Sequence, residues 1–367
     1  MTTPEEILKR IYKQSDTILK HHGSKLYLSK KPLSDLEKHQ RNAYRFLTAN
    51  SQIKFCRLLK TNFVDLQYLI NNPIYKTYKV PKKKGGYREI SAPVSNLKKV
   101  HKRLNYFLQA YYLCIKPDEA MGFIINPRYL DTKHDIIENA RMHVGKKYIL
   151  NIDLKDFFSS ISARRVKELF SSNLFYFDDQ MVTALTLLTT YKGKLPTGSP
   201  TSPVLSNFLC LQMDLEIRDF CILNSIRYSR YADDLSFSSN MKIEQEQIEE
   251  IIKIIKQNNF EINEKKLRLR RSFQKQVVTG IVVNEKVNVD RKLIRKIRAI
   301  IHDITLNGLA AAAKRHFNQN GEIDRKDQLY FRNKIEGYIR FIGQVRGKED
   351  FIYNRLLNDF SKSFNIR

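Results

Sequence analysis

The chain has 367 residues, which is enough for two or three subdomains around a sizeable core. Lysine and arginine number 65 against 38 acidic residues, a formal charge of +27, and this indicates either a polyanionic partner such as a nucleic acid or a generally basic surface. No apolar run approaches the roughly 18 residues of a membrane-spanning helix, and the first residues lack the apolar region of a signal peptide, so we expect no membrane partner and a cytoplasmic location.

The four cysteines lie far apart and form no Cys-x-x-Cys pair. This distribution argues against a zinc ribbon and is typical of a protein from a reducing cytoplasm, such as that of a bacterium. The cysteines are Cys56, Cys114, Cys210 and Cys221.

The spacing of apolar residues predicts helices over residues 1–70, with an amino-terminal helical extension at 1–50 that carries no recognisable chemistry. The next segment, Tyr75–Pro93, predicts a β-hairpin, because apolar residues alternate on both sides of Gly85-Gly86. The tip of this hairpin is cationic, and Arg88 follows the glycines directly. By itself, the pattern is also typical of a solvated basic turn.

A helix of mixed basic and aromatic character is predicted over Leu97–Cys114. Asn139 and His143 follow at helical spacing and alone would predict only the polar face of a helix. A short apolar run, Tyr148–Ile152, then predicts a buried strand that ends at Asp153.

Two further helices are predicted, over Ser162–Phe170 and Asp178–Tyr191. Ser162 is expected to cap the first helix, and the Asp178-Asp179 pair is expected to cap the second and to supply its first-turn charge. The turn-rich segment that begins at Leu195 leads into one apolar helix that carries Leu205, Leu209, Met213 and Ile217.

The segment Ile226–Ser239 predicts two strands joined by a tight acidic turn, because apolar residues alternate on both sides of Ala232-Asp233-Asp234. Adjacent carboxylates repel each other unless a cation neutralises them, and divalent metals prefer carboxylate ligands. An Asp-Asp pair alone occurs often by chance. Asp153, at the end of another strand, supplies the third carboxylate of a possible metal site.

The last third of the chain is basic and helical. Residues Ile248–Ile255 predict an amphipathic helix that ends near Asn258-Asn259, and further helices are predicted over Tyr330–Phe360. Between Lys265 and Arg298 there are twelve lysines and arginines and two acids. A helix in this stretch has an apolar stripe, and its other face, which would ordinarily be a solvated one, carries Arg291, Arg295 and Arg298.

Taken together, these motifs resemble the palm of reverse transcriptases, which has Tyr-x-Asp-Asp on a hairpin opposite an aspartate at a strand end. The loop at Leu195 resembles the family's Leu-Pro-Gln-Gly-x-x-x-Ser-Pro block, with Thr197 in place of the usual glutamine. Two further motifs are similar to marks of the retron-type bacterial reverse transcriptases. They are Asn139-Ala140-x-x-His143 and Val278-Thr279-Gly280.

The resemblance implies an α/β right-hand polymerase fold with fingers, a palm built on an antiparallel sheet, and a helical thumb. Following it, we place the amino-terminal extension at 1–50 and the fingers at 51–145. The palm, interleaved with part of the fingers, is placed at 146–285. The thumb and an RNA-binding carboxyl-terminal region are placed at 286–367.

The resemblance also implies roles for individual residues. Asp153, Asp233 and Asp234 would be catalytic and would hold two Mg²⁺ ions. In nucleotide binding, Arg88 would hold the triphosphate, Phe158 would exclude a 2′-hydroxyl, and Lys266 would assist the departure of pyrophosphate. Residues expected to bind RNA are Asn139, His143, Val278, Thr279, Gly280, Arg291, Arg295 and Arg298.

The implied activity is RNA-directed DNA synthesis on a dedicated structured noncoding RNA, giving a branched RNA–DNA molecule (msDNA) in an antiphage retron system. The implied partners are that RNA and its DNA product, deoxynucleoside triphosphates and an effector protein. Two alternatives remain. One is another bacterial reverse transcriptase, such as a group II intron type, and the other is an RNA-binding scaffold that holds an effector.

Overall fold

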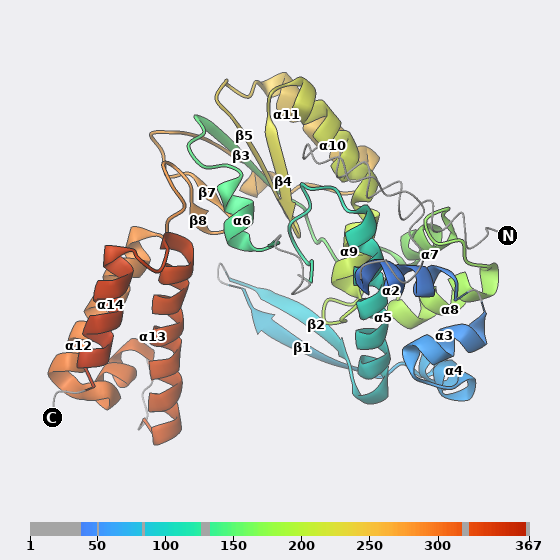
Figure 1. Ribbon diagram of the computed structural model, residues 1–367, viewed down its shortest axis with the longest axis horizontal. Coiled ribbons are helices and arrows are strands. Elements are labelled where there is room, and N and C mark those ends of the chain that lie inside the picture. Colours follow the sequence, from blue (N-terminus) through green and yellow to red (C-terminus); the bar gives the residue numbers. More distant parts are fainter. Residues whose placement is uncertain (1–37, 50, 83–84, 126–132, 318–322, 365–367) are drawn as a thin grey trace. The chain divides into compact units, whose positions relative to one another are not determined.

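The computed structural model describes residues 38–49, 51–82, 85–125, 133–317 and 323–364 (Figure 1). The chain forms two compact units, each described here by itself. The first extends to His134 and also contains 150–237 and 241–268, and the second contains 135–149, 238–240 and the chain from Leu269 onward. The division into fingers, palm and thumb follows function rather than packing, and its boundaries stay a prediction.

The first unit begins with a group of short helices that pack on one long helix. Side chains cap two of them: Ser51 accepts a hydrogen bond from the backbone N–H of Lys54, and Asn62 accepts one from that of Asp65. The long helix contacts both α2 and α3 (Figure 1). The helices are α2 (Lys38–Leu47), α3 (Gln52–Leu59), α4 (Phe63–Asn71) and α5 (Ser95–Ile115). Helices predicted before Lys38 lie outside the described residues.

The predicted hairpin is confirmed as β1 (Tyr75–Pro81) and β2 (Tyr87–Pro93), which pair antiparallel from Tyr75–Pro93 to Pro81–Tyr87. Two lysines of its cationic tip, Lys83 and Lys84, lie outside the described residues.

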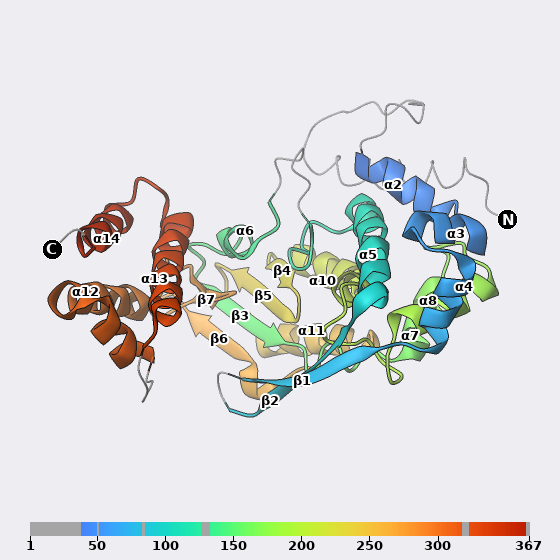
Figure 2. The same cartoon turned by 90° about the horizontal axis from the view of Figure 1, so that it is seen from below.

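A four-stranded sheet lies next, with its strands in the order β4-β5-β3-β6 (Figure 2). Its side chains Tyr228, Leu235 and Phe237 are buried, as the alternating pattern predicts, and α10 packs against β4 and α11. The strands are β3 (Tyr148–Asp153), β4 (Arg227–Tyr231), β5 (Asp234–Ser239) and β6 (Arg268–Arg271); the helices are α10 (Leu211–Leu223) and α11 (Gln245–Gln257).

The two predicted helix caps are confirmed. Ser162 accepts a hydrogen bond from the backbone N–H of Arg165 at the start of α7 (Ala163–Ser171), and Asp178 accepts one from that of Met181 at the start of α8 (Asp179–Thr189). Asp178-Asp179 is therefore a helix start and no part of a metal site.

One helix assignment is corrected. The single apolar helix predicted through Leu205 and Ile217 is divided at Cys210 into α9 (Ser202–Leu209) and α10. At Cys210 ψ is −7°, far from the regular helical value of about −42°, and this interrupts the helix although Leu205 and Ile217 both stay buried.

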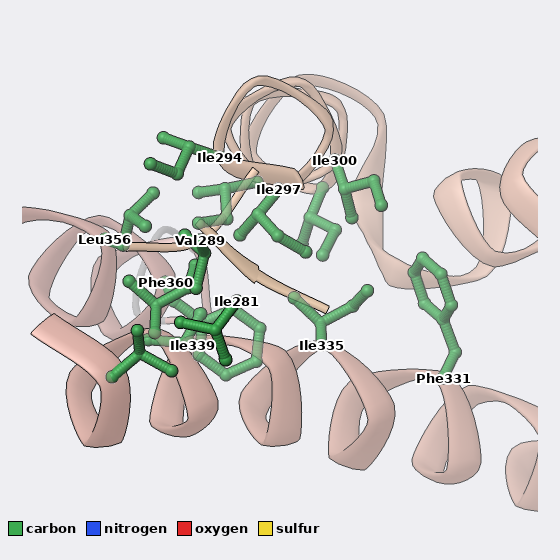
Figure 3. Close-up of a cluster of buried hydrophobic side chains, with 14 of the residues drawn as sticks. Ile281, Val289, Ile294, Ile297, Ile300, Phe331, Ile335, Ile339, Leu356 and Phe360 are labelled. Atoms are coloured by element: carbon green, nitrogen blue, oxygen red, sulfur yellow. The ribbon is translucent and has the colours of Figure 1, made fainter. Parts of the chain in front are cut away.

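The second unit is a helical bundle with a small hairpin. Its core is mostly isoleucine at helical spacing, with Ile297, Ile300, Ile335 and Ile339 facing one another and Phe331 at one end (Figure 3). Gly308, with φ of 76°, breaks the longest helix. The elements are α6 (Ile136–Arg141), β7 (Val277–Val278), β8 (Ile281–Val282), α12 (Arg291–Phe317), α13 (Arg325–Arg346) and α14 (Phe351–Lys362). Among the described helices of the whole chain, none has the length and apolar character needed to cross a membrane.

Candidate active site

The acidic turn lies at the tip of the β4–β5 hairpin, as predicted. Ala232 adopts a positive φ of 60°, and Asp234 begins β5. Strand β3 is the neighbour of β5 and ends at Asp153, and the backbone N–H of Leu154 donates to the carbonyl oxygen of Asp233 at 2.9 Å. The structure therefore brings the strand end and the acidic turn together.

Gly122 fixes the position of this turn. A Cβ atom at Gly122 would lie 2.3 Å from the backbone nitrogen of Ala232 and 2.9 Å from the carbonyl carbon of Tyr231. Only glycine allows the two backbones to approach this closely. The Gly122-Phe123 segment thus passes directly against the backbone of the acidic turn.

Lys266 forms an ion pair with the third carboxylate. Its Nζ lies 2.6 Å from Oδ1 of Asp153, and it belongs to the short 3₁₀ turn η2 (Glu264–Lys266). Asn263 ties this turn to β3, because its backbone N–H donates to the carbonyl oxygen of Asp153 at 2.7 Å. Lys266, predicted to assist the departure of pyrophosphate, therefore lies against Asp153, and its ammonium group neutralises that carboxylate.

The electrostatics of the acidic turn favour a bound cation. Partial burial, then the Asp233 and Asp153 carboxylates, raise the pKa of Asp234 to about 6. Burial also raises the pKa of Asp233, with a further contribution from Asp153 and an opposing one from Lys266 and Arg88. A divalent cation would relieve the repulsion that raises both values.

The donor chemistry fits a hard divalent metal, since three carboxylates from two neighbouring strands share one site. Across the described ranges, however, no three acidic, histidine or cysteine side chains are already arranged as metal ligands. Because Lys266 pairs with Asp153, that side chain must release the carboxylate before Asp153 can act as a ligand.

A cavity of about 1670 Å³ opens beside the acids. Asp153 and Asp233 line it together with the predicted nucleotide-binding side chains Arg88, Phe158 and Lys266. The structure thus gathers every predicted nucleotide-binding residue around one space, although nucleotide binding itself stays a prediction. Thr197, which stands in the place of the family's glutamine, also lines this cavity.

Two contacts shape the walls of this cavity. Phe157 is buried and packs on Phe260 with ring centroids 5.9 Å apart, whereas Phe158 is only partly buried and packs on Phe123 at 5.6 Å. Both phenylalanines line the cavity, and Phe158 is the more exposed of the two. Gly198 lies against β2, because a Cβ there would meet the carbonyl oxygen of Ser91 at 2.9 Å.

A buried ion pair beneath the turn was missed by sequence reasoning. Nε and Nη2 of Arg230 donate to the two carboxylate oxygens of Asp214 at 2.8 and 2.7 Å, and neither side chain is exposed. Nη1 of Arg230 donates to the carbonyl oxygen of Ala232 at 3.1 Å and to Oδ1 of Asn207 at 3.0 Å. The guanidinium thus holds the acidic turn by its backbone.

The sequence did contain a signal for this arginine. The period of two puts Arg230 on the same face of β4 as the apolar Tyr228, and a buried guanidinium requires an acidic partner. Burial opposes the charge of Arg230, but the neighbouring Asp214 carboxylate outweighs it and raises the pKa of Arg230.

The residues of the two retron marks lie in the second unit and are mostly buried. Asn139, His143 and Val278 have no exposed surface. The His143 Nδ1 atom lies 2.8 Å from Oγ of Ser238, and Oγ1 of Thr279 donates to the carbonyl oxygen of Ile136 at 3.0 Å. Thr279 thus ties the β7–β8 hairpin to α6, whereas the amide group of Asn139 has no hydrogen-bond partner among the described residues. Direct contact with RNA is not open to the buried side chains in this structure, and RNA recognition by the set stays a prediction.

Other predicted RNA-binding residues do reach the surface. Gly280, with φ of 84°, follows Thr279 in the tight β7–β8 turn. Arg291, Arg295 and Arg298 are exposed on α12, opposite the buried isoleucines of that helix. Their contact with RNA also stays a prediction.

Comparison with known proteins assigns the family. The family model for reverse transcriptase (RNA-dependent DNA polymerase) matches residues 80–289, more than half of the chain. The Ec73 retron reverse transcriptase of Escherichia coli is 31% identical over 292 residues, which cover 74% of this chain and 83% of that protein.

Two further relatives match over shorter stretches. The Ec86 retron reverse transcriptase of Escherichia coli is 38% identical over 175 residues, covering 47% of this chain and 54% of the relative. The Mx65 retron reverse transcriptase of Myxococcus xanthus is 30% identical over 247 residues, covering 62% and 55%. The chain spans about half the length of these two relatives. The mixed helices and antiparallel sheet, together with the family match, confirm the right-hand polymerase fold, and the chain belongs to the retron-type reverse transcriptases.

Proposed function

We propose that this protein is an RNA-directed DNA polymerase that copies a dedicated structured noncoding RNA. The observation that carries the proposal is the convergence of Asp153 and Asp233 on one cavity that Arg88 and Phe158 also line. Asp234 follows Asp233 directly, and the carboxylates of Asp233 and Asp153 both raise its pKa. The product would be a branched RNA–DNA molecule (msDNA), made in an antiphage retron system together with an effector protein. The four described cysteines are free and buried, which suits a bacterial cytoplasm.

The proposed catalytic step is transfer of a deoxynucleotide onto a hydroxyl group. Two Mg²⁺ ions, held by Asp153, Asp233 and Asp234, would supply activation of that hydroxyl and charge neutralisation at the leaving pyrophosphate. Arg88 is exposed on β2 and can present two N–H groups to a triphosphate. Phe158 presents a flat apolar surface to the sugar and leaves no hydrogen-bond partner for a 2′-hydroxyl.

Lys266 has two successive positions in this proposal. Without metal its ammonium group neutralises Asp153, which lowers the cost of keeping three carboxylates together. With Asp153 as a metal ligand, the lysine, which also lines the cavity, would be free to donate a proton or a hydrogen bond to the departing phosphate.

The test is to express the chain with its neighbouring genomic DNA and to extract nucleic acid. Wild type is compared with the Asp233→Asn/Asp234→Asn variant and with Asp178→Asn/Asp179→Asn. The second variant is a matched control, because it removes the same two charges from a helix start, where asparagine also caps. We expect an RNase-resistant DNA joined to RNA in wild type and in the control, and none in the first variant.

A second assay separates the alternatives. If wild type makes no branched product but extends an annealed primer on RNA, the protein is a reverse transcriptase of another type and the retron part of the proposal fails. If it does neither yet binds RNA tightly, the RNA-binding scaffold replaces the polymerase.

A further inference from the structure

A second cavity of the first unit lies between α2, α3 and α5 and is strongly basic. It has a volume of about 400 Å³, and none of its lining residues lines the cavity beside the acids. Its cations come from three helices: α2 and α3 follow each other in the chain, α5 comes later, and α2 and α3 both pack on α5 (Figure 1). We call it the α2–α5 cavity, and its cations are Lys38, Arg41, Arg45, Arg57 and Arg103.

The described lining residues of the α2–α5 cavity carry an excess of positive charge. Among these described residues there are five cations and no aspartate or glutamate. Lys38, Arg45 and Arg57 form no ion pair with any described residue. Positive charges that face one cavity repel each other, and a bound anion would offset this repulsion by attracting each of them.

Part of the cavity wall is already held in place for binding. Nε of Arg103 donates to the carbonyl oxygen of Leu58 at 2.9 Å, and its guanidinium carbon lies 5.5 Å from the ring centre of Tyr106 and 5.0 Å from that of Phe107. These contacts fix the arginine, which reduces the side-chain entropy lost when it binds an anion.

Tyr106 adds an oriented hydroxyl group. Its Oη accepts a hydrogen bond from Nδ2 of Asn42 at 2.8 Å, and only 8% of Asn42 is exposed. Because the amide is the donor, the phenolic proton of Tyr106 is left to donate to another acceptor. Tyr106 is also 39% exposed, so the wall offers hydrogen-bond donors, positive charge and an aromatic side chain together.

An ordinary solvated basic face does not explain this arrangement. Such a face follows one helix and spreads its charges into solvent. Here residues from three helices converge on a hollow whose volume suits a phosphate with its attached sugar.

We propose that the α2–α5 cavity binds phosphate groups of RNA at a site separate from the catalytic cavity. The choice of RNA as the polyanion rests on the proposed function; the anion site itself rests on the cavity. Arginine supplies paired donors to phosphate oxygens, and Tyr106 supplies a surface on which a base or sugar packs. The site anchors a folded RNA through its backbone and contributes affinity rather than sequence choice.

The test compares two triple variants of the full chain that lose the same charge. Arg41→Gln/Arg45→Gln/Arg57→Gln empties the cavity of three cations, and Lys98→Gln/Lys167→Gln/Arg227→Gln removes three exposed cations that line neither cavity. Binding of a fluorescent RNA hairpin of about 30 nucleotides is followed by anisotropy between roughly 50 and 300 mM KCl. Thermal unfolding checks that each variant is folded.

We expect the cavity variant to bind about tenfold or more weakly and the slope of log K against log[salt] to become shallower by about two to three. The control variant should change the slope by less than about one. Arg41→Lys/Arg45→Lys/Arg57→Lys should keep most of the slope, because lysine still pairs with phosphate. Equal losses in the two glutamine variants would mean that only net charge matters and would overturn the proposal.

The outcome is separable from that of the proposed function. Primer extension by wild type on an annealed RNA template is measured alongside. Absence of extension would remove the polymerase, while a loss of RNA binding confined to the cavity variant would still establish the site. Extension without any difference between the two triple variants would leave the polymerase and remove the site.

Discussion

Two aspartate–cation pairs lie near the acidic turn, and they differ in exposure and geometry. Asp153 and Lys266 meet at a single contact, and their side chains are 14% and 49% exposed. Asp214 and Arg230 meet through two hydrogen bonds, and neither is exposed. The first pair sits in the cavity, and the second lies beneath the turn.

The difference separates an exchangeable cation from a fixed one. Water competes for an exposed single-contact pair, so Lys266 can leave Asp153 at little cost. A buried bidentate arginine has no such alternative, because losing its partner would leave a charge in a low-dielectric interior. The same pairing chemistry thus leaves the Asp153 carboxylate available for another cation and fixes the backbone of the acidic turn.

Arg230→Met is the substitution at these two pairs from which we expect the largest loss of stability. The substitution leaves Asp214 buried and unpaired and removes the donor to the carbonyl oxygen of Ala232, so we expect a loss of about 3–5 kcal/mol in unfolding free energy. Chemical denaturation measures the loss, and primer extension should fall with it.

A double variant tests whether the unpaired charge is the cause. Asp214→Asn/Arg230→Met removes the stranded carboxylate while the asparagine still accepts from Oη of Tyr228, and it should be more stable than Arg230→Met alone. If the double variant loses the sum of the two single effects, the two side chains do not act as a pair.

Gly122→Ala would disturb the acidic turn through a different contact from that of Arg230. The carbonyl oxygen of Gly122 accepts from Nδ2 of Asn207, which also bonds Arg230, so the glycine belongs to the same buried network. The new methyl group would displace the turn at Ala232; we expect about 1–3 kcal/mol of destabilisation and about a hundredfold loss of primer extension.

Gly337→Ala is the matched control. It lies within α13 with nothing within 4 Å of the added Cβ, so the change should stabilise slightly, by about 0.5–1 kcal/mol, and leave extension unaltered. Comparable activity in the two alanine variants would show that the turn tolerates displacement.

The strands that carry the acids and the contacts that hold the acidic turn differ in how far they could be predicted from the sequence. The hairpin and the strand ending at Asp153 were predictable, because alternation and turns are local patterns. The partners of Arg230 and the closeness of Gly122 to Ala232 were not, since both depend on how β4 meets segments from elsewhere in the chain.

The residues of the two retron motifs show a different limit of prediction from sequence. Asn139 and His143 were recognised from their spacing, but spacing at i and i+4 gives a shared helix face without saying whether that face is exposed. In the structure α6 ends at Arg141, so His143 lies beyond the helix and the expected helix face is not formed; both side chains are nevertheless buried, and Nδ1 of His143 lies 2.8 Å from Oγ of Ser238 on β5. The family motif therefore left the physical environment of these residues undetermined, and their role in RNA binding stays a prediction.

Lys266→Gln tests whether the lysine of the exposed pair competes with metal for Asp153. Because the pair is exposed, we expect less than about 1 kcal/mol of change in stability. Without the competing ammonium group, Asp153 should bind Mg²⁺ more tightly in the absence of nucleotide, while nucleotide incorporation slows. Titration calorimetry measures the first effect and single-turnover extension the second. Weaker Mg²⁺ binding in Lys266→Gln would show that the lysine does not compete with the metal.

The smallest expected effect concerns the pH dependence of the metal-free protein. The folded-state pKa of Asp234 is about 6 and its ordinary value is 3.8, so the folded chain binds the proton more tightly than the unfolded chain. This group therefore favours folding most at low pH, and its contribution is lost as pH rises from about 4 to about 6.

Asp234→Asn removes this dependence. In EDTA at pH 7 the variant should melt a few degrees higher than wild type, roughly 2–4 °C, and the difference should shrink as pH falls below about 6. Mg²⁺ should raise the melting temperature of wild type more than that of the variant, since the carboxylate that repels its neighbours without metal is also a proposed ligand. A melting difference that stays constant from pH 7 down to about 4 would place the cause outside the ionisation of Asp234.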